Sequence, residues 1–201
     1  MRAVERGDQQ LVQIVDAALV DAERRSGDWL VCRPGCTQCC IGVFAISQLD
    51  VLRLRQGLAE LERTDPQRAA QVRERARASA TRLSADFPGD SATGLLDESD
   101  EAQERFADFA NDEPCPVLSA EGTCDLYSAR PITCRAFGPP VRSEDGLGVC
   151  ELCFHGATDE QIAACEMEVD PDNLESQLLD QLNEATGAHG KTVIAFALSV
   201  P

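Results

Sequence analysis

The sequence lacks any long apolar run, and this absence excludes a membrane-spanning helix. No segment of the 201 residues approaches the roughly 20 consecutive apolar residues that a bilayer crossing needs. The opening MRAVERGDQQ is charged and is not followed by an apolar stretch of signal-peptide length. We therefore expect a cytoplasmic protein that has no membrane partner.

Basic residues are also scarce relative to acidic ones. The chain has 18 Lys and Arg against 35 Asp and Glu, which gives a formal net charge of -17. Such a negative field repels the phosphates of nucleic acids and of anionic lipids, so nucleic-acid binding is disfavoured. The acidity itself is typical of a solvated surface and indicates no particular function.

Histidine is nearly absent, and no catalytic machinery is evident. Neither His155 nor His189 has neighbours in a pattern that would make it a general base. The GLG run at Gly146 to Gly148 lacks the strand and helix that flank a nucleotide-binding loop. The sequence therefore identifies no catalytic residue and predicts no organic cofactor.

Apolar residues recur at helical spacing in several segments, and the intervals between them carry turn residues. We expect helices over residues 9–25, after a Ser47 cap, from Asp65 to Leu83, over 99–110, and from Pro171 to Gly187.

Three further segments complete the expected elements. Thr158 and Gln161 form another helix-starting pattern, residues 85–98 have the composition of a loop, and the tail KTVIAFALS fits a strand or a helix.

Between residues 111 and 156 the periodicity vanishes while Cys, Pro and Gly accumulate. Bound metal could supply the order that regular backbone ladders do not. The predicted fold is mainly α, a helical scaffold around irregular cysteine-rich loops that converge on a metal site. We expect a single domain over residues 1–201, with a cysteine-cluster metal-binding core at 30–155 and flanking helices.

Cysteine, in contrast, is abundant: there are ten, and four lie in the stretch CRPGCTQCC. A reducing cytosol disfavours the two disulfide alternatives, a secreted disulfide scaffold and a bond between the adjacent Cys39 and Cys40. Adjacent sulfurs in an extended chain point in opposite directions, so either the backbone bends sharply at this pair or the two sulfurs have different partners. Clustered thiolates select zinc, copper(I) or iron–sulfur centres.

The remaining cysteines show further spacings, some of which also fit a role other than metal binding. Cys150 and Cys153 have the two-residue gap of zinc knuckles, with His155 as a substitute ligand or an ordinary loop residue, whereas Cys165 is expected to be a small buried apolar residue. The spacing of Cys32, Cys36 and Cys39 matches that of radical S-adenosylmethionine enzymes. The alternation of strands and helices that those enzymes need does not follow it.

Two segments together resemble a known family. CRPGCTQCC and the later CPVLSAEGTCDLYSARPITCRAFG are similar to the cysteine-cluster (CxxCxxCC) family, described as a putative zinc- or iron-chelating domain. The second segment carries Cys-Pro, Gly, Cys, Tyr, Arg-Pro and Cys-Arg in the order of the family pattern. This chain departs from the pattern by having three residues, not two, between its first two cysteines.

The resemblance implies eight metal ligands: Cys32, Cys36, Cys39, Cys40, Cys115, Cys124, Cys134 and Cys150. Eight thiolates can fill two four-coordinate sites or one cluster with sulfurs in reserve. Arg130 and Arg135 could offset the negative charge of such a site, with surface salt bridging as the alternative.

The leading functional interpretation is a metal-binding protein that holds an iron–sulfur cluster or zinc, with a redox or metal-handling role. Two alternatives remain open at this point. One is a metal-dependent enzyme that resembles the related flagellin lysine methylase. The other is a structural zinc module whose acidic helices bind a protein partner.

Overall fold

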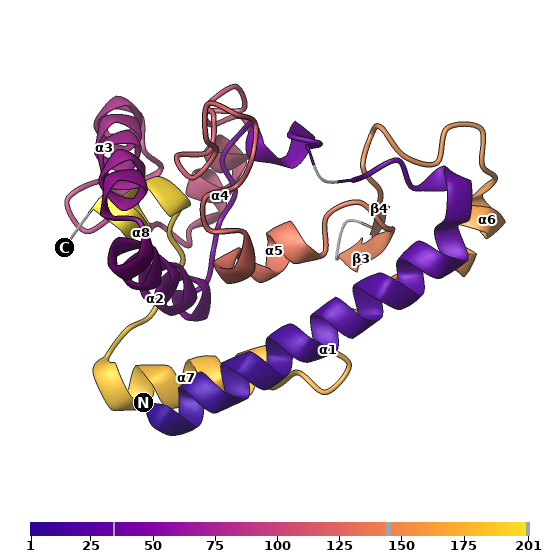
Figure 1. Cartoon of the computed structure of the whole chain (residues 1–201), viewed down its shortest axis with the longest axis horizontal. Coiled ribbons are helices and arrows are strands. Elements are labelled where there is room, and N and C mark those ends of the chain that lie inside the picture. Colours follow the sequence, from indigo (N-terminus) through magenta and orange to yellow (C-terminus); the bar gives the residue numbers. More distant parts are fainter. Residues whose placement is uncertain (34, 144–145, 200–201) are drawn as a thin grey trace. The chain divides into compact units, whose positions relative to one another are not determined.

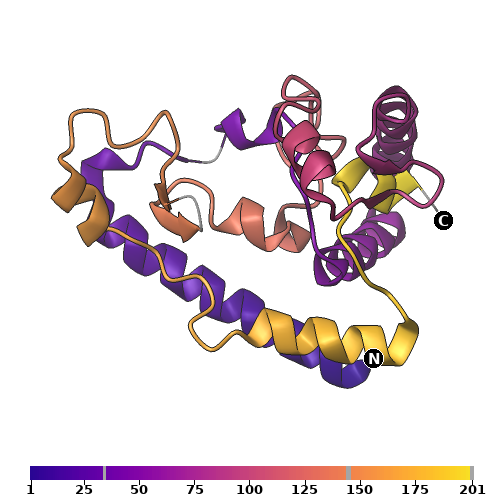
Figure 2. The same cartoon turned by 180° about the vertical axis from the view of Figure 1, so that it is seen from behind.

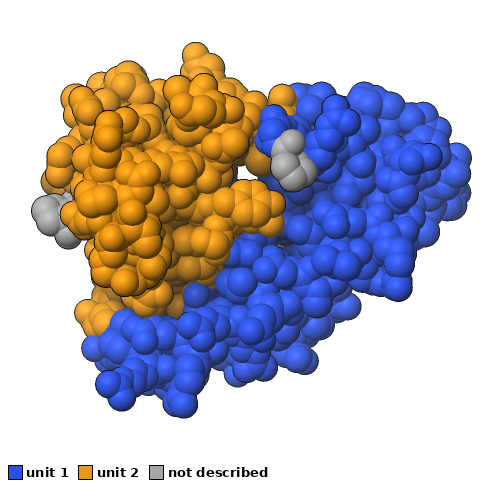
Figure 3. All heavy atoms as spheres, in the orientation of Figure 1, with its two compact units in different colours: residues 1–36, 132–185 blue, residues 37–131, 186–201 orange. Residues whose placement is uncertain are grey.

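The computed structural model describes residues 1–33, 35–143 and 146–199, and the chain divides into two compact units (Figure 3). Unit 1 comprises Met1–Cys36 and Ile132–Ala185, and unit 2 comprises Thr37–Pro131 and Thr186–Pro201. Each unit is thus assembled from two separate stretches of chain. The expectation of a single domain over residues 1–201 stays a prediction.

The expectation of a mainly α fold is confirmed. Within the described residues the sheets are two small two-stranded pairs, and the remaining regular structure is helical (Figure 1). In the part of the chain that the structure covers, no helix has the length and apolar character needed to cross a bilayer.

The longest helix of unit 1 is α1 (Arg2–Ser26), which starts earlier than expected and ends at Gly27, where φ is 51°. Its apolar stripe buries Leu11 and Val15 completely. Helix α7 (Leu174–Thr186) runs beside α1 in both views (Figures 1 and 2), and its Leu178 lies directly against Gly7.

The start of α7 differs from the expectation that Pro171 opens this helix. The Asp170 carboxylate accepts hydrogen bonds from the backbone N–H groups of Leu174 (3.0 Å) and Glu175 (2.8 Å). A carboxylate that satisfies these free N–H groups fixes the first turn, so the helix begins at Leu174. The helix buries Leu178 and Leu182, whereas Ala185 is exposed.

Unit 1 is completed by short elements between these helices: η1 (Gly27–Trp29), α5 (Ile132–Arg135), β3 (Val141–Ser143), β4 (Gly146–Gly148) and α6 (Asp159–Ala164). Strand β4, which contains the GLG run, pairs antiparallel with β3. Helix α6 begins at the predicted capping box, in which Thr158 and Gln161 each accept a backbone N–H of the other.

Unit 2 is built on a helical hairpin of α2 (Gln48–Thr64) and α3 (Pro66–Leu83). Ser47 and Asp50 form the expected capping box, and the Asp65 side chain caps α3 ahead of a proline at its first position. The ambiguous tail forms helix α8 (Ile194–Ser199), which packs against both α2 and α3. Residues 193–198 are all buried, which explains why the sequence shows no periodicity there.

Unit 2 also contains a set of short elements outside this hairpin. The expected loop over 85–98 contains a small pair of strands, β1 (Gly89–Asp90) and β2 (Leu95–Leu96). Helix α4 (Asp100–Ala107) ends earlier than expected, yet Phe106 and Phe109 pack as predicted into an apolar cluster with Phe87. Two one-turn 3-10 helices, η2 (Gln38–Cys40) and η3 (Tyr127–Ala129), lie in the cysteine-rich part.

Candidate metal centres

Within the described residues none of the ten cysteines is joined in a disulfide, and the eight predicted ligands divide equally between the two units. Unit 2 holds Cys39, Cys40, Cys115 and Cys124, and unit 1 holds Cys32, Cys36, Cys134 and Cys150. The first cysteine segment therefore contributes residues to both units, because the boundary between the units falls directly after Cys36.

In unit 2 the two predicted segments lie side by side. The backbone N–H of Cys115 donates to the carbonyl of Cys40 at 2.8 Å, and Ile41 forms an antiparallel bridge with Pro114. The N–H of Gly42 donates to the carbonyl of Glu113 at 2.9 Å, which extends the pairing. The backbone of the Cys39–Cys40 pair thus lies directly beside the downstream cysteine segment.

The loop between Cys115 and Cys124 is closed by its own hydrogen bonds. Leu118 and Cys124 form an antiparallel bridge, and the N–H of Asp125 donates to the carbonyl of Val117 at 2.8 Å. The turn is made at Gly122, where φ is 75°, a conformation that glycine adopts without strain. Cys115 and Cys124 both pack against the hairpin core. The loop therefore returns the second thiol to the neighbourhood of the first.

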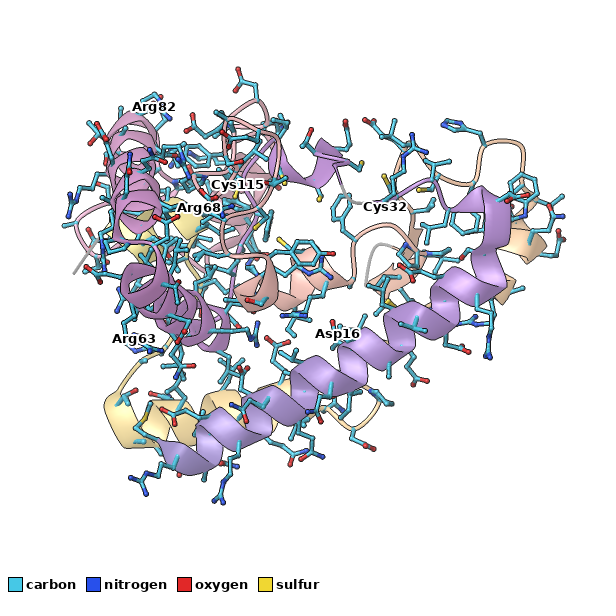
Figure 4. All side chains as sticks on the ribbon, in the orientation of Figure 1. Asp16, Cys32, Arg63, Arg68, Arg82 and Cys115 are labelled. Carbon is cyan, nitrogen blue, oxygen red and sulfur yellow. The ribbon has the colours of Figure 1, made fainter. Side chains whose placement is uncertain are left out.

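Two arginines of α3 tie the ends of this loop together, and Figure 4 labels one of them, Arg68, together with Cys115. Asp125, whose side chain is only 1% exposed, receives Arg68 and Arg75 at 2.5 Å each. Arg75 also donates through Nε to the carbonyl of Pro116 at 2.8 Å. One guanidinium thus bridges the residue after Cys115 and the residue after Cys124. Sequence reasoning missed these residues, because the only local signal is an aspartate next to a cysteine.

The thiols of unit 2 influence one another. A hydrogen bond from Cys40 lowers the pKa of Cys39 to about 6, and the same bond raises the pKa of Cys40. Burial raises the pKa of Cys115 to about 12 and also raises the pKa of Cys124. The charges of Cys115 and Cys124 both act on Cys40, so the four sulfurs share one electrostatic environment.

The two arginines that were expected near a metal site have different roles. The hydrogen bond from Cys40 is the main cause that lowers the pKa of Cys39, and the positive charge of Arg130 adds to it. At Cys124 burial raises the pKa, and the charge of Arg130 offsets part of that rise. Arg130 also stacks on Tyr127 at 4.0 Å. Arg135 belongs to α5 of unit 1 and donates to Asp16 of α1 at 2.8 Å. The Arg135 side chain is 5% exposed, so it forms a salt bridge with Asp16 that is partly buried and is not the surface salt bridge considered as the alternative.

Unit 1 gathers a second group of thiols. Cys150 and Cys153 share a tight turn, in which the N–H of Cys153 donates to the carbonyl of Cys150 at 2.8 Å, and their thiols are hydrogen-bonded. Burial is the main cause that raises the pKa of Cys150, and the charges of Cys153 and Cys36 add to it. Cys165 is buried, as expected for an apolar role, whereas His155 is exposed.

As the side chains stand in the described residues, no three Cys, His, Asp or Glu groups enclose a position for an ion. A cysteine side chain has a single torsion that places its sulfur, and its three staggered positions are readily exchanged. The donor set itself fits a soft metal, because thiolates are the ligands that zinc and iron–sulfur centres prefer. The ligand role of the eight cysteines stays a prediction.

The fold and these thiol groups define a class of mainly helical proteins with cysteine-lined loops suited to soft metals. The chain belongs to the CxxCxxCC family, whose model is described as a putative zinc- or iron-chelating domain and matches residues 31–153. The resemblance noted in the sequence is thereby confirmed. No curated protein and no solved structure matches the chain.

Proposed function

We propose that this protein is a metal-binding protein in which Cys39, Cys40, Cys115 and Cys124 of unit 2 hold zinc or an iron–sulfur cluster. The observation that carries the proposal is the 2.8 Å backbone bond between Cys115 and Cys40, which brings two distant cysteine segments together. Four thiols from two segments are the usual ligand set of closed zinc sites and of iron–sulfur clusters.

The surroundings of these thiols support the same proposal. Four thiolates outweigh the charge of a divalent ion, and Arg130 supplies positive charge that acts on Cys39 and Cys124. The clamp of Arg68 and Arg75 on Asp125 holds the Cys115–Cys124 loop on α3. A bound zinc ion would cross-link the two segments, and an iron–sulfur cluster would add one-electron redox chemistry.

The test is metal analysis of the full chain after purification without oxygen. We expect zinc or iron in stoichiometric amounts, and its loss from unit 2 in the variants Cys115→Ser and Cys124→Ser. Brown colour with acid-labile sulfide selects iron–sulfur over zinc, and unfolding on chelation without any redox signal selects a structural zinc role.

A control is Cys165→Ala, which removes a buried cysteine of unit 1 that lies outside the predicted ligands. We expect this variant to keep the metal of unit 2. The absence of both metals from the parent protein, or equal metal content in Cys115→Ser and the control, would refute the proposal.

A further inference from the structure

We propose that unit 1 carries a second thiolate metal site, formed by residues of unit 1 alone, and that Cys153 is one of its ligands together with Cys32 and Cys150. The inference rests on the proposed affinity of this protein for soft metals. It goes beyond that function in the number of sites and in the ligand set, because Cys153 is not among the eight predicted ligands.

The turn at Cys150 and Cys153 is the first observation. Two cysteines separated by two residues recur in zinc sites, because the turn between them directs both sulfurs to the same side. Here the turn is formed, with the N–H of Cys153 on the carbonyl of Cys150 at 2.8 Å and a hydrogen bond between the two thiols. The matched family region also extends to residue 153.

The second observation is that the N-terminal segment is fastened to this turn. The N–H of Phe154 donates to the carbonyl of Trp29 at 2.9 Å, which places the chain leading to Cys32 beside Cys153. Cys32 and Cys150 both pack against the cluster that contains Cys153. Three thiols of unit 1 thus come together from two segments of the chain.

The third observation concerns the close packing of these thiols and their low exposure to solvent. Gly138, at φ 121°, approaches Cys32 so closely that an added Cβ would lie 3.3 Å from the Cys32 Cβ. Cys153 is 6% exposed, and Trp29, Leu30 and Phe154 surround the thiols with apolar atoms. An apolar shell excludes water and competing oxygen ligands, which favours zinc or iron(II) over magnesium or calcium.

The experiment titrates the reduced, metal-free full chain with cobalt(II) without oxygen. Tetrahedral thiolate–cobalt complexes absorb in the visible and near ultraviolet, so the spectrum counts thiolate sites directly. We expect about two equivalents for the parent chain and about one for Cys153→Ser. We expect about two for Cys165→Ala, since Cys165 is equally buried in the same cluster and serves as the packing control.

The variants of the two units separate this inference from the proposed function. If Cys153→Ser binds as much cobalt as the parent, or if Cys165→Ala loses as much as Cys153→Ser, the second site is refuted while the unit 2 centre stands. If Cys115→Ser leaves the count unchanged and Cys153→Ser lowers it, the unit 2 centre is refuted instead.

Alkylation of the parent protein tests the same site without any substitution, should a variant fail to fold. We expect cobalt to slow the alkylation of Cys32, Cys150 and Cys153 at least tenfold, with the modified residues identified by mass spectrometry. Equal modification rates with and without cobalt would overturn the assignment.

Discussion

At the scale of single residues, the adjacent Cys39 and Cys40 show how local geometry decides what a cysteine pair can do. The sequence left two arrangements open, a sharp bend or sulfurs with different partners. The structure places both residues in the 3-10 turn η2, and their thiols are hydrogen-bonded to each other. The backbone is therefore bent, and both sulfurs can belong to one group of metal ligands.

Gly138 offers a residue-scale prediction about the packing of Cys32. Its φ of 121° is strained for any other residue, and an added Cβ would meet Leu30 at 3.2 Å and Cys32 at 3.3 Å. We expect Gly138→Ala to lower the free energy of unfolding by about 2–3 kcal/mol in urea titrations.

The control is Gly156→Ala in the same unit. Gly156 also has a positive φ, 80°, but an added Cβ would meet nothing within 4 Å. We expect a loss of only about 1 kcal/mol, the cost of the left-handed backbone alone. Equal losses in the two variants would show that Gly138 is not required for the approach of Cys32.

At the scale of elements, helix α2 and the 3-10 turn η3 touch at a glycine. An added Cβ on Gly57 would lie 2.3 Å from the Cβ of Ala129. Alanine favours a helix interior by about 1 kcal/mol over glycine, yet this contact is too short to be relieved by a side-chain rotation. We expect Gly57→Ala to destabilise the protein in spite of its helix propensity, as measured by urea unfolding.

A second substitution checks the cause of that effect. Ala129→Gly removes the atom in conflict, so we expect the double variant with Gly57→Ala to be more stable than Gly57→Ala alone. Failure of the rescue would mean that the helix, and not the contact with η3, is what the single substitution perturbs.

The clamp of α3 on the Cys115–Cys124 loop gives a further element-scale prediction. Removal of the Asp125 carboxylate leaves Arg68 and Arg75 without their shared partner. Because these side chains are 43% and 33% exposed, water recovers part of the loss. We expect Asp125→Ala to lower the free energy of unfolding by about 2 kcal/mol and to weaken metal retention by unit 2.

Glu62→Ala is the matched control, because Glu62 pairs with another arginine of α3, Arg73, and is 56% exposed. We expect a change within about 0.5 kcal/mol and unchanged metal content. Normal metal retention in Asp125→Ala would show that the clamp contributes stability without positioning the thiols.

At the scale of the whole molecule, we expect removal of the metal to destabilise the cysteine-rich loop more than the helical core. The α2–α3–α8 core has its own buried apolar side chains, whereas the loop over 115–124 has few regular backbone ladders. We expect a chelator to accelerate amide exchange in that loop while α2 and α3 stay protected, as followed by hydrogen exchange with mass spectrometry. Simultaneous loss of protection in all these segments would contradict an independent helical core.

The helices were largely predictable because their signals are local. Ser47 with Asp50, Asp65 with Pro66, and Thr158 with Gln161 act on neighbouring backbone groups, and each begins a helix at the expected place. The start of α7 was missed because Pro171 is an equally good local signal, while the actual cap is the Asp170 side chain. The buried α8 was ambiguous because a helix covered on all sides has no polar face.

The sequence by itself determined the mainly α class, the family and the residues able to bind a soft metal, since capping, periodicity and thiol chemistry are written in residue types and short spacings. Only the tertiary structure decided how those thiols are grouped. It separates Cys36 from Cys39 and pairs Cys40 with Cys115, and it brings Cys153 to the N-terminal segment. Such groupings depend on hydrogen bonds and burial between distant segments, which no local pattern records.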